Sequence, residues 1–242
     1  MKVPEKEKLE TFAFHSTRLD SIPAKMDDVY QTSAGSNIHP YIAGHFVCCN
    51  LIFEYRQNKY LFTKPEDISI NHINKQLNWL FRMHKNLLYE VAKPDINQEE
   101  YVKYQEIKSS VQSSDLGYLR MNRHFIIQNE KKVECVDPLD LPQKMIEWYK
   151  EMSSTYYKYV EKIHTPLCLE ESDVIELVNW AYDANLFICA SQPFTHGSNM
   201  LGRLTENLLR SMSGLPWKVI KHDDKKKKMQ YAKDIQEKYH NI

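Results

Sequence analysis

The sequence predicts a mainly α-helical protein with a single β-hairpin. Three observations support this fold class: apolar residues recur at three- and four-residue spacing over several segments, one pair of strand-like segments flanks a polar turn, and glycine is scarce. The chain has 242 residues and 6 glycines, whereas average usage of about 7% gives roughly 17. Folds that depend on repeated glycine turns, such as Rossmann and P-loop domains, are therefore disfavoured.

Composition and charge exclude several classes of partner and indicate the cellular compartment. The 32 basic residues balance 32 acidic ones, so no long-range field draws the chain to nucleic acid, and we expect no nucleic-acid partner. No segment approaches the ~18 apolar residues of a membrane span. The 5 cysteines show no CxxC spacing, which argues against a zinc site or a disulfide framework. The sequence predicts a cytoplasmic protein and no metal site.

The N-terminal part gives the weakest signals. Residues 1–40 show no helical periodicity. The segment from Ile42 to Phe62 is rich in apolar and aromatic residues, and it fits a buried helix and a strand pair equally well. We expect residues 1–62 to form an extension that packs on a domain at 63–242.

A helix is predicted to begin near Thr63, because Thr63 and Glu66 have the spacing of a capping box and Pro65 stands in the first turn. Its apolar stripe includes His84. A hydrogen-bonded core histidine explains that position better than a ligand or a base. The stripe consists of Ile70, Ile73, Leu77, Leu80, His84 and Leu87.

The predicted hairpin pairs Phe125, Ile126 and Ile127 with residues 133–136 across a polar turn. Two strands alone are marginally stable, so the hairpin must pack on helices. A long polar loop is expected at 93–114.

Helices are predicted on both sides of the most informative loop. The first of these helices begins at Pro142. Further helices are predicted at 156–164, 172–189 and 204–212. The lysine run 225–228 is interpreted as a solvated helix face, because acidic residues surround it.

The polar loop at 191–203 joins two of these helices. The N–H groups at the start of the second helix, together with Gly197, are suited to form an anion-binding concavity that holds phosphate. An ordinary helix–helix connection capped by Ser198 or Asn199 explains the same residues. Physical reasoning alone favours the ordinary connection.

This loop resembles the signature of the Fic (Fido) family, whose members transfer AMP, or less often another phosphate-linked group, to a protein hydroxyl. The family pattern is His-Pro-Phe, one free residue, Asp or Glu, Gly-Asn-Gly-Arg, two free residues and Arg. Pro193, Phe194, Gly197 and Arg203 stand in their expected places. The Gly-x-x-Arg at 117–120 resembles the start of the family's hairpin. The resemblance spans roughly residues 65 to 221 and implies a Fic-like helical bundle with a hairpin flap.

The departures from this pattern concern the chemistry. Gln192 replaces the His that takes a proton from the hydroxyl, and a carboxamide does not titrate near neutral pH. His196 replaces the acid that holds Mg²⁺, and imidazole is a poor ligand for that ion, so we expect no Mg²⁺. Ser198, Asn199 and Met200 replace Asn, Gly and the first Arg.

The resemblance also assigns binding roles. It implies that Gly197, Ser198, Asn199 and Arg203 bind the phosphates of ATP or another nucleotide, and that the hairpin at 125–127 docks a protein target by strand pairing. Some members carry an inhibitory helix whose Glu pairs with the final Arg. The segment 36–39 lies where such a motif is found but lacks the Glu, so we expect no inhibitory segment.

Three functions are compatible with the sequence. The favoured one is a divergent Fic-fold pseudoenzyme that has lost AMPylation and binds a nucleotide or a protein partner. The second is an active transferase with an altered donor or with His196 as a displaced base. The third is a helical interaction protein whose loop matches by chance. Many relatives are bacterial, including translocated effectors, so the host cytosol is the alternative location.

Overall fold

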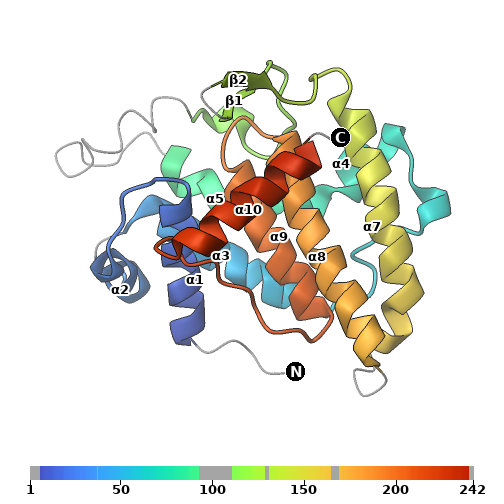
Figure 1. The fold of residues 1–242 in the computed structure, drawn as a ribbon, viewed down its shortest axis with the longest axis horizontal. Coiled ribbons are helices and arrows are strands. Elements are labelled where there is room, and N and C mark those ends of the chain that lie inside the picture. The colour runs from blue at the N-terminus through green and yellow to red at the C-terminus, as the bar shows by residue number, and fades with distance from the viewer. Residues whose placement is uncertain (1–5, 37, 93–110, 129–130, 165–168, 240–242) are drawn as a thin grey trace.

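The computed structural model describes residues 6–36, 38–92, 111–128, 131–164 and 169–239 (Figure 1). Helices dominate these residues, and one pair of short strands accompanies them, so the mainly α-helical fold class is confirmed. The helices are α1 (Lys6–Leu19), α2 (Met26–Ala34), α3 (Pro40–Tyr55), α4 (Ile73–Gln76), α5 (Asn78–Ala92), α7 (Leu141–Ile163), α8 (Glu171–Ser191), α9 (Ser198–Met212) and α10 (Lys225–Tyr239).

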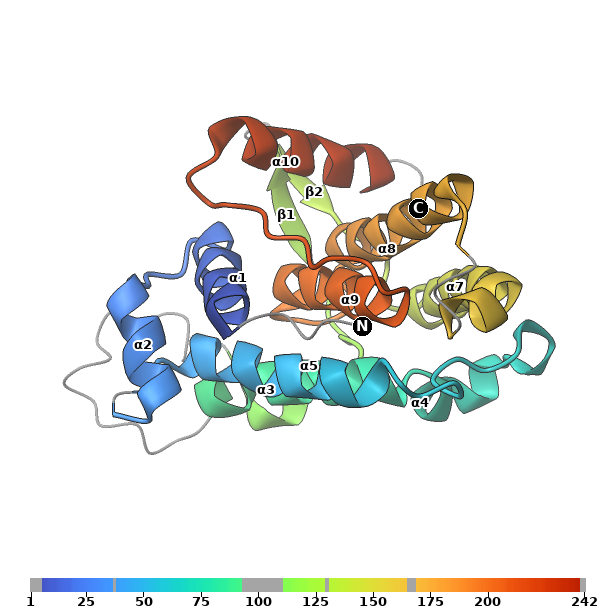
Figure 2. The same ribbon diagram turned by 90° about the horizontal axis from the view of Figure 1, so that it is seen from below.

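Helix α9 lies at the centre of the bundle. It packs on α8, α3, α5 and α1, and in Figure 2 it lies between the layer of α3 and α5 and the covering helix α10. All its residues except Asn199 are buried. The loop that precedes α9 is therefore fixed to the most enclosed element of the fold, and the charged side chains of α9 need partners inside the protein.

Two glycines allow helices to approach closely. A Cβ built on Gly44 of α3 would lie 1.9 Å from the Leu87 carbonyl oxygen of α5. A Cβ on Gly202 of α9 would lie 2.7 Å from Asn185 Oδ1 and 2.8 Å from Cys189 Sγ, both on α8. Any larger residue at either position would push the helix pair apart.

The predicted hairpin is confirmed. Strand β1 (Phe125–Gln128) pairs antiparallel with β2 (Lys131–Glu134), with Phe125 opposite Glu134. The hairpin projects beyond the helices at the top of Figure 1. Arg123, just before β1, pairs with the Glu134 carboxylate at 3.2 Å.

The N-terminal segment differs from expectation, because it contains α1 and α2 within residues 1–40. Helix α1 showed no apolar period since its buried face is mixed, with Glu10, His15, Ser16 and Thr17 beside Phe12. The segment from Ile42 to Phe62, which fits a helix and a strand pair equally well in the sequence, is helical up to Tyr55 and belongs to α3, which begins at Pro40. Ten of the 16 residues of α3 are buried, so no single apolar stripe exists. Helix α3 packs on α5 and α9, and a boundary at residue 62 stays a prediction.

Two predicted helix boundaries were wrong. No helix begins at Thr63: short 3₁₀ turns at Pro65–Asp67 and Ile70–His72 precede α4 and α5. The Thr63 N–H donates instead to the Tyr149 hydroxyl at 3.0 Å. The helix predicted at 156–164 is the second half of α7, which runs without a break. Most of the loop expected at 93–114 lies outside the described residues.

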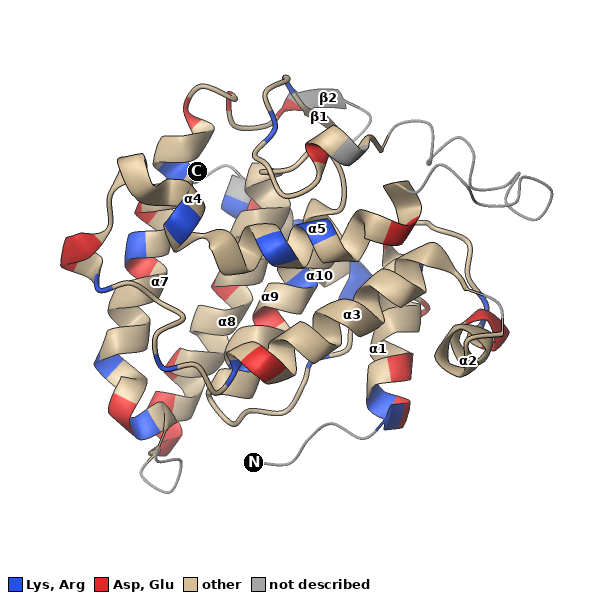
Figure 3. Ribbon diagram, turned by 180° about the vertical axis from the view of Figure 1, so that it is seen from behind, with Lys and Arg blue, Asp and Glu red and all other residues tan. Residues whose placement is uncertain are grey.

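The face of the protein seen in Figure 3 carries both acidic and basic residues, and neither sign dominates it. The two signs alternate along α7, whereas α3 carries almost no charged residues. Lys225, Lys226, Lys227 and Lys228 are exposed on α10, as predicted. Among the described residues, no helix combines the length and the apolar character needed to cross a membrane.

Candidate functional site

The loop between α8 and α9 starts at Gln192, which adopts a left-handed conformation with φ 46° and ψ 60°. Its backbone N–H still donates to Ile188 C=O and ends α8. The side-chain Nε2 donates to Cys189 C=O and, at 2.7 Å, to Asn199 Oδ1 on α9. Gln192 is 8% exposed. Its carboxamide therefore ties the two ends of the loop together.

Ser198 closes the loop from the other side. Its hydroxyl accepts a hydrogen bond from Phe194 N–H and donates to Phe194 C=O, each at 3.2 Å. Gly197, immediately before it, has φ 75°, which is the left-handed region that favours glycine. The Ser198 side chain is thus turned back into the loop as an internal brace.

His84 of α5 holds the middle of the loop. Its Nε2–H donates to His196 C=O at 2.9 Å, and its Nδ1 accepts from Gly117 N–H at 3.0 Å. The ring stacks on Phe194 with centroids 3.9 Å apart. Burial lowers the pKa of His84 to about 4, so the imidazole is neutral at pH 7. The predicted hydrogen-bonded core histidine is confirmed.

Arg120 joins the same loop to the hairpin. Its Nε donates to Gln192 C=O at 2.6 Å, and its backbone N–H donates to Pro193 C=O at 3.0 Å. The guanidinium also donates to Asn122 C=O and to Val136 C=O, just beyond β2. Arg120 is 3% exposed. A shift of the hairpin base would therefore be felt directly at the start of the loop.

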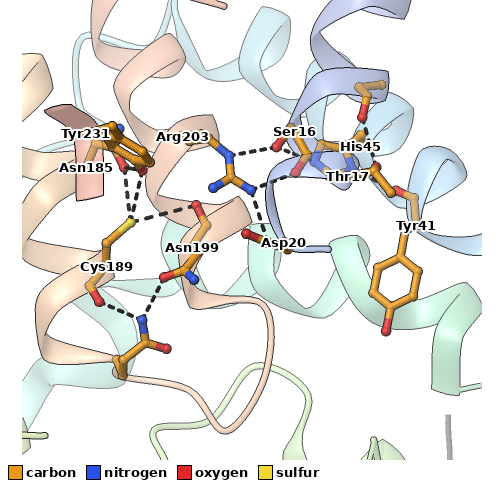
Figure 4. Close-up of polar contacts among 12 residues, drawn as sticks. Ser16, Thr17, Asp20, Tyr41, His45, Asn185, Cys189, Asn199, Arg203 and Tyr231 are labelled. Atoms are coloured by element: carbon orange, nitrogen blue, oxygen red, sulfur yellow. Dashed lines mark hydrogen bonds and ion pairs between the residues drawn. The ribbon is translucent and has the colours of Figure 1, made fainter. Parts of the chain in front are cut away.

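Arg203 lies on the opposite side, against α1 (Figure 4). Its Nε donates to Ser16 Oγ at 2.9 Å and its Nη2 to Ser16 C=O at 2.8 Å. The same Nη2 lies 3.0 Å from the Asp20 carboxylate. Burial opposes the charge, but the Asp20 carboxylate outweighs it, so the pKa of Arg203 is raised and the guanidinium stays charged. We call Ser16, Asp20 and Arg203 the arginine clamp.

The clamp corrects the expectation that no segment pairs with the final signature arginine. The acid is Asp20, just after α1, and not a residue of 36–39, where His39 instead precedes α3. The available signal was Ser16 four residues before Asp20. The sequence does not indicate this pairing more strongly, because residues 1–40 show no helical period and because the acid is Asp in place of the Glu that the resemblance implies.

An open cavity of about 410 Å³ lies between the loop and the N-terminal segment. It brings together five of the predicted site residues, whereas Arg203 does not line it. Asp20 does, and it is the one Asp, Glu, Lys or Arg among the lining residues. The charged side chain among the lining residues is therefore a carboxylate, which does not attract phosphate. The lining residues are Asp20, Ile22, Tyr41, Leu88, Gln192, Thr195, His196, Gly197, Ser198, Asn199 and Met200.

The hairpin end presents a different surface. Phe125 is 39% exposed, and Ile126 is half-buried. The side chain of Ile127 lies outside the described residues. Near the start of the hairpin, Tyr118 and Met121 are 66% and 85% exposed. Tyr118 also lines an open groove of about 720 Å³ between α5 and residues 114–118.

Comparison with known proteins supports the fold. The structure is similar to the crystal structure of a Fic domain-containing signalling protein from Bacteroides thetaiotaomicron, with a TM-score of 0.63 and 14% sequence identity. The likeness covers 95% of this chain and 71% of that chain. No protein-family model matches the sequence, and no curated protein does. At this identity the likeness shows a Fic-like fold and nothing about the reaction.

Proposed function

We propose that this chain uses its Fic-like fold for binding a partner protein and has lost the standard AMP-transfer reaction. The observation that carries the proposal is the arginine clamp. The one signature cation that the sequence keeps is buried against Asp20 and Ser16, outside the cavity where a nucleotide phosphate would have to lie.

The loop supports the same conclusion. At the position of the general base, the Gln192 side chain is engaged in holding the loop closed. A carboxamide can neither take nor release a proton near pH 7, and the loss of a general base lowers rates by about 10²–10⁴. His196 at the metal position favours softer ions than Mg²⁺. Nucleotide and Mg²⁺ are therefore not assigned as cofactors.

The partner surface is proposed at the hairpin. Tyr118 and Met121 expose apolar side chains next to a groove, and exposed aromatic and methionine side chains are enriched in protein interfaces. Arg120 connects this surface to the loop through hydrogen bonds to the carbonyls of Gln192 and Val136. A bound partner would therefore rest on a part of the chain that these hydrogen bonds hold in place. A cytoplasmic location, or the host cytosol for a translocated protein, remains a prediction.

Labelling tests the loss of transfer. The purified chain is incubated with a lysate and with ATP labelled at the α-phosphate, then with labelled CTP, UTP and CDP-choline. We expect no incorporation from wild type. The Asp20→Asn variant, which weakens the clamp, should also give none, since the base is still missing. Asp27→Asn on α2 is the matched control. Incorporation that is abolished by Arg203→Ala would contradict the proposal.

A second candidate, a transferase with a displaced base, is favoured by one observation: His196 and Gln192 line the same cavity. It predicts incorporation that His196→Ala abolishes and that Asp20→Asn increases, because the clamp would release Arg203 towards phosphate. The labelling experiment above therefore separates the two functions.

Partner binding is tested at the hairpin. Proteins cross-linked to the wild-type chain in cells are compared with those captured by a Tyr118→Ser, Met121→Ser double variant. Ile175→Ser is the control, because Ile175 is also exposed, at 56%, but lies on α8. We expect a partner that the double variant loses and the control keeps. Identical capture by all three chains would exclude this surface.

A further inference from the structure

Three side chains of the types that bind metal ions meet where α1 lies against the segment between α9 and α10. His15 is on α1, and His222 and Asp223 lie just before α10. The two Nδ1 atoms are 2.8 Å apart, and one ligand atom from each of the three residues lies within 4.8 Å of the others. His15 is 8% exposed, and Asp223 faces solvent, so the group has a buried side and an open one.

We propose that His15, His222 and Asp223 form a binding site for Zn²⁺. Two imidazole nitrogens and one carboxylate oxygen are a common ligand set for zinc, and three protein ligands leave a fourth tetrahedral position for water. With Zn–N distances of about 2.0–2.1 Å, tetrahedral geometry separates two nitrogens by about 3.3 Å. The His15–His222 distance has to open by only about 0.5 Å from the 2.8 Å observed. Hard ions such as Mg²⁺ and Ca²⁺ prefer oxygen ligands and should not compete.

The surroundings of the two histidines suit a metal. The Phe14 ring lies 5.0 Å from the His15 ring and edge-on to His222 at 5.2 Å, so it shields one side of the pair from water.

The position of the site gives it a structural effect on the cavity. His15 is followed by Ser16, which holds Arg203 through both its hydroxyl and its carbonyl. A zinc ion shared by α1 and the segment after α9 would fasten α1 across Arg203 and keep the clamp closed. The ion would act from outside the cavity and would take no part in a reaction there.

Zinc binding is tested on the full chain, without a histidine tag and after chelator treatment. Titration calorimetry should give one saturable Zn²⁺ per chain. At a hundredfold excess over Kd, the melting temperature should rise by roughly 5–10 °C. Co²⁺ in place of Zn²⁺ should give the visible absorption of a tetrahedral site. Amide exchange in α1 should slow when Zn²⁺ is added.

His222→Gln and Asp223→Asn are the test variants, because these two residues are less buried than His15 and can change without opening the core. We expect His222→Gln to abolish the cobalt spectrum and the thermal shift, and Asp223→Asn to weaken binding at least tenfold. His72→Gln, which removes an exposed histidine elsewhere, should bind as wild type does. Absence of saturable Zn²⁺ binding, or Zn²⁺ binding that survives His222→Gln, would overturn the proposal. The contact between His15 and His222 would then be a hydrogen bond only.

Discussion

The loop between α8 and α9 and the first two turns of α9 are held on two sides, an α5 end and an α1 end, by different kinds of contact. At the α5 end, Phe194 stacks on a neutral His84, and the loop carbonyls accept hydrogen bonds from His84 and Arg120. At the α1 end, Arg203 is held by the Asp20 carboxylate and by Ser16. The α5 end depends on burial and on hydrogen bonds to backbone carbonyls, whereas the α1 end uses the same charge attraction that a phosphate would offer. An anionic ligand can therefore compete at the α1 end alone.

The largest effect is expected from Phe194→Ala at the α5 end. Phe194 is fully buried, and removal of a buried Phe side chain costs about 4 kcal/mol through lost burial and the cavity left behind. Urea denaturation measures this loss of unfolding free energy. Met121→Ala, at an 85% exposed position, is the control and should change stability by less than about 0.5 kcal/mol. Equal effects of the two changes would mean that the loop is not anchored by this ring.

Asp20→Ala should break the α1 end. It leaves the Arg203 guanidinium buried without its carboxylate, and we expect a loss of about 3 kcal/mol. The Asp20→Ala, Arg203→Met double variant should lose less than the sum of the single changes, because the uncompensated charge is gone. Added sulfate should raise the melting temperature of Asp20→Ala more than that of wild type. Additive losses with no sulfate effect would contradict the comparison between the two ends.

The dependence of the unfolding free energy on pH tests the neutral His84 at the α5 end. The pKa of His84 is lowered from 6.5 to about 4, so the unfolded chain takes up a proton below pH 6.5 while the folded chain does not until about pH 4. The stabilisation is complete above pH 6.5 and is lost as the pH falls towards 4. Between pH 7 and pH 5, wild type should lose about 2 kcal/mol more than His84→Gln, which does not titrate. Parallel pH profiles in urea denaturation would show that His84 is not neutral in the folded protein.

Ser198→Ala gives the smallest expected change. It removes the acceptor of the buried Phe194 N–H, which costs about 1 kcal/mol. Thermal unfolding is sensitive enough to measure this difference. Ser154→Ala, where an exposed hydroxyl on α7 donates to Lys150 C=O, is the matched control and should be nearly neutral. Equal melting temperatures of the two variants would show that the Ser198 hydroxyl does not stabilise the loop.

The sequence predicts those parts of the fold in which one face of an element is buried. Helix α7 and the first half of α8 follow this rule, and their apolar periods are readable in the sequence. Helix α3 is buried on most sides and therefore shows no period, while α1 buries polar residues such as Ser16 and Thr17. In both helices it is the tertiary environment, and not the local pattern, that determines which residues are inside.

The site could be predicted in part, because its loop is continuous in sequence. Gln192, His196 and Gly197 were identified from a short motif, and they share one cavity. The partners of Arg203 could not be predicted in this way. Ser16 lies 187 residues from Arg203, and no local spacing connects them. The burial of the last signature cation is a property of the folded chain alone.

The close helix crossings at Gly44 and Gly202 have a consequence for tracing the ancestry of this chain. These crossings set how α3 meets α5 and how α8 meets α9, and neither depends on what the loop binds. Proteins of this fold with different residues in the loop should still carry a small residue at both crossings. A search pattern built on these two positions and on Arg120 should therefore recover chains of this fold that a pattern built on the loop would miss.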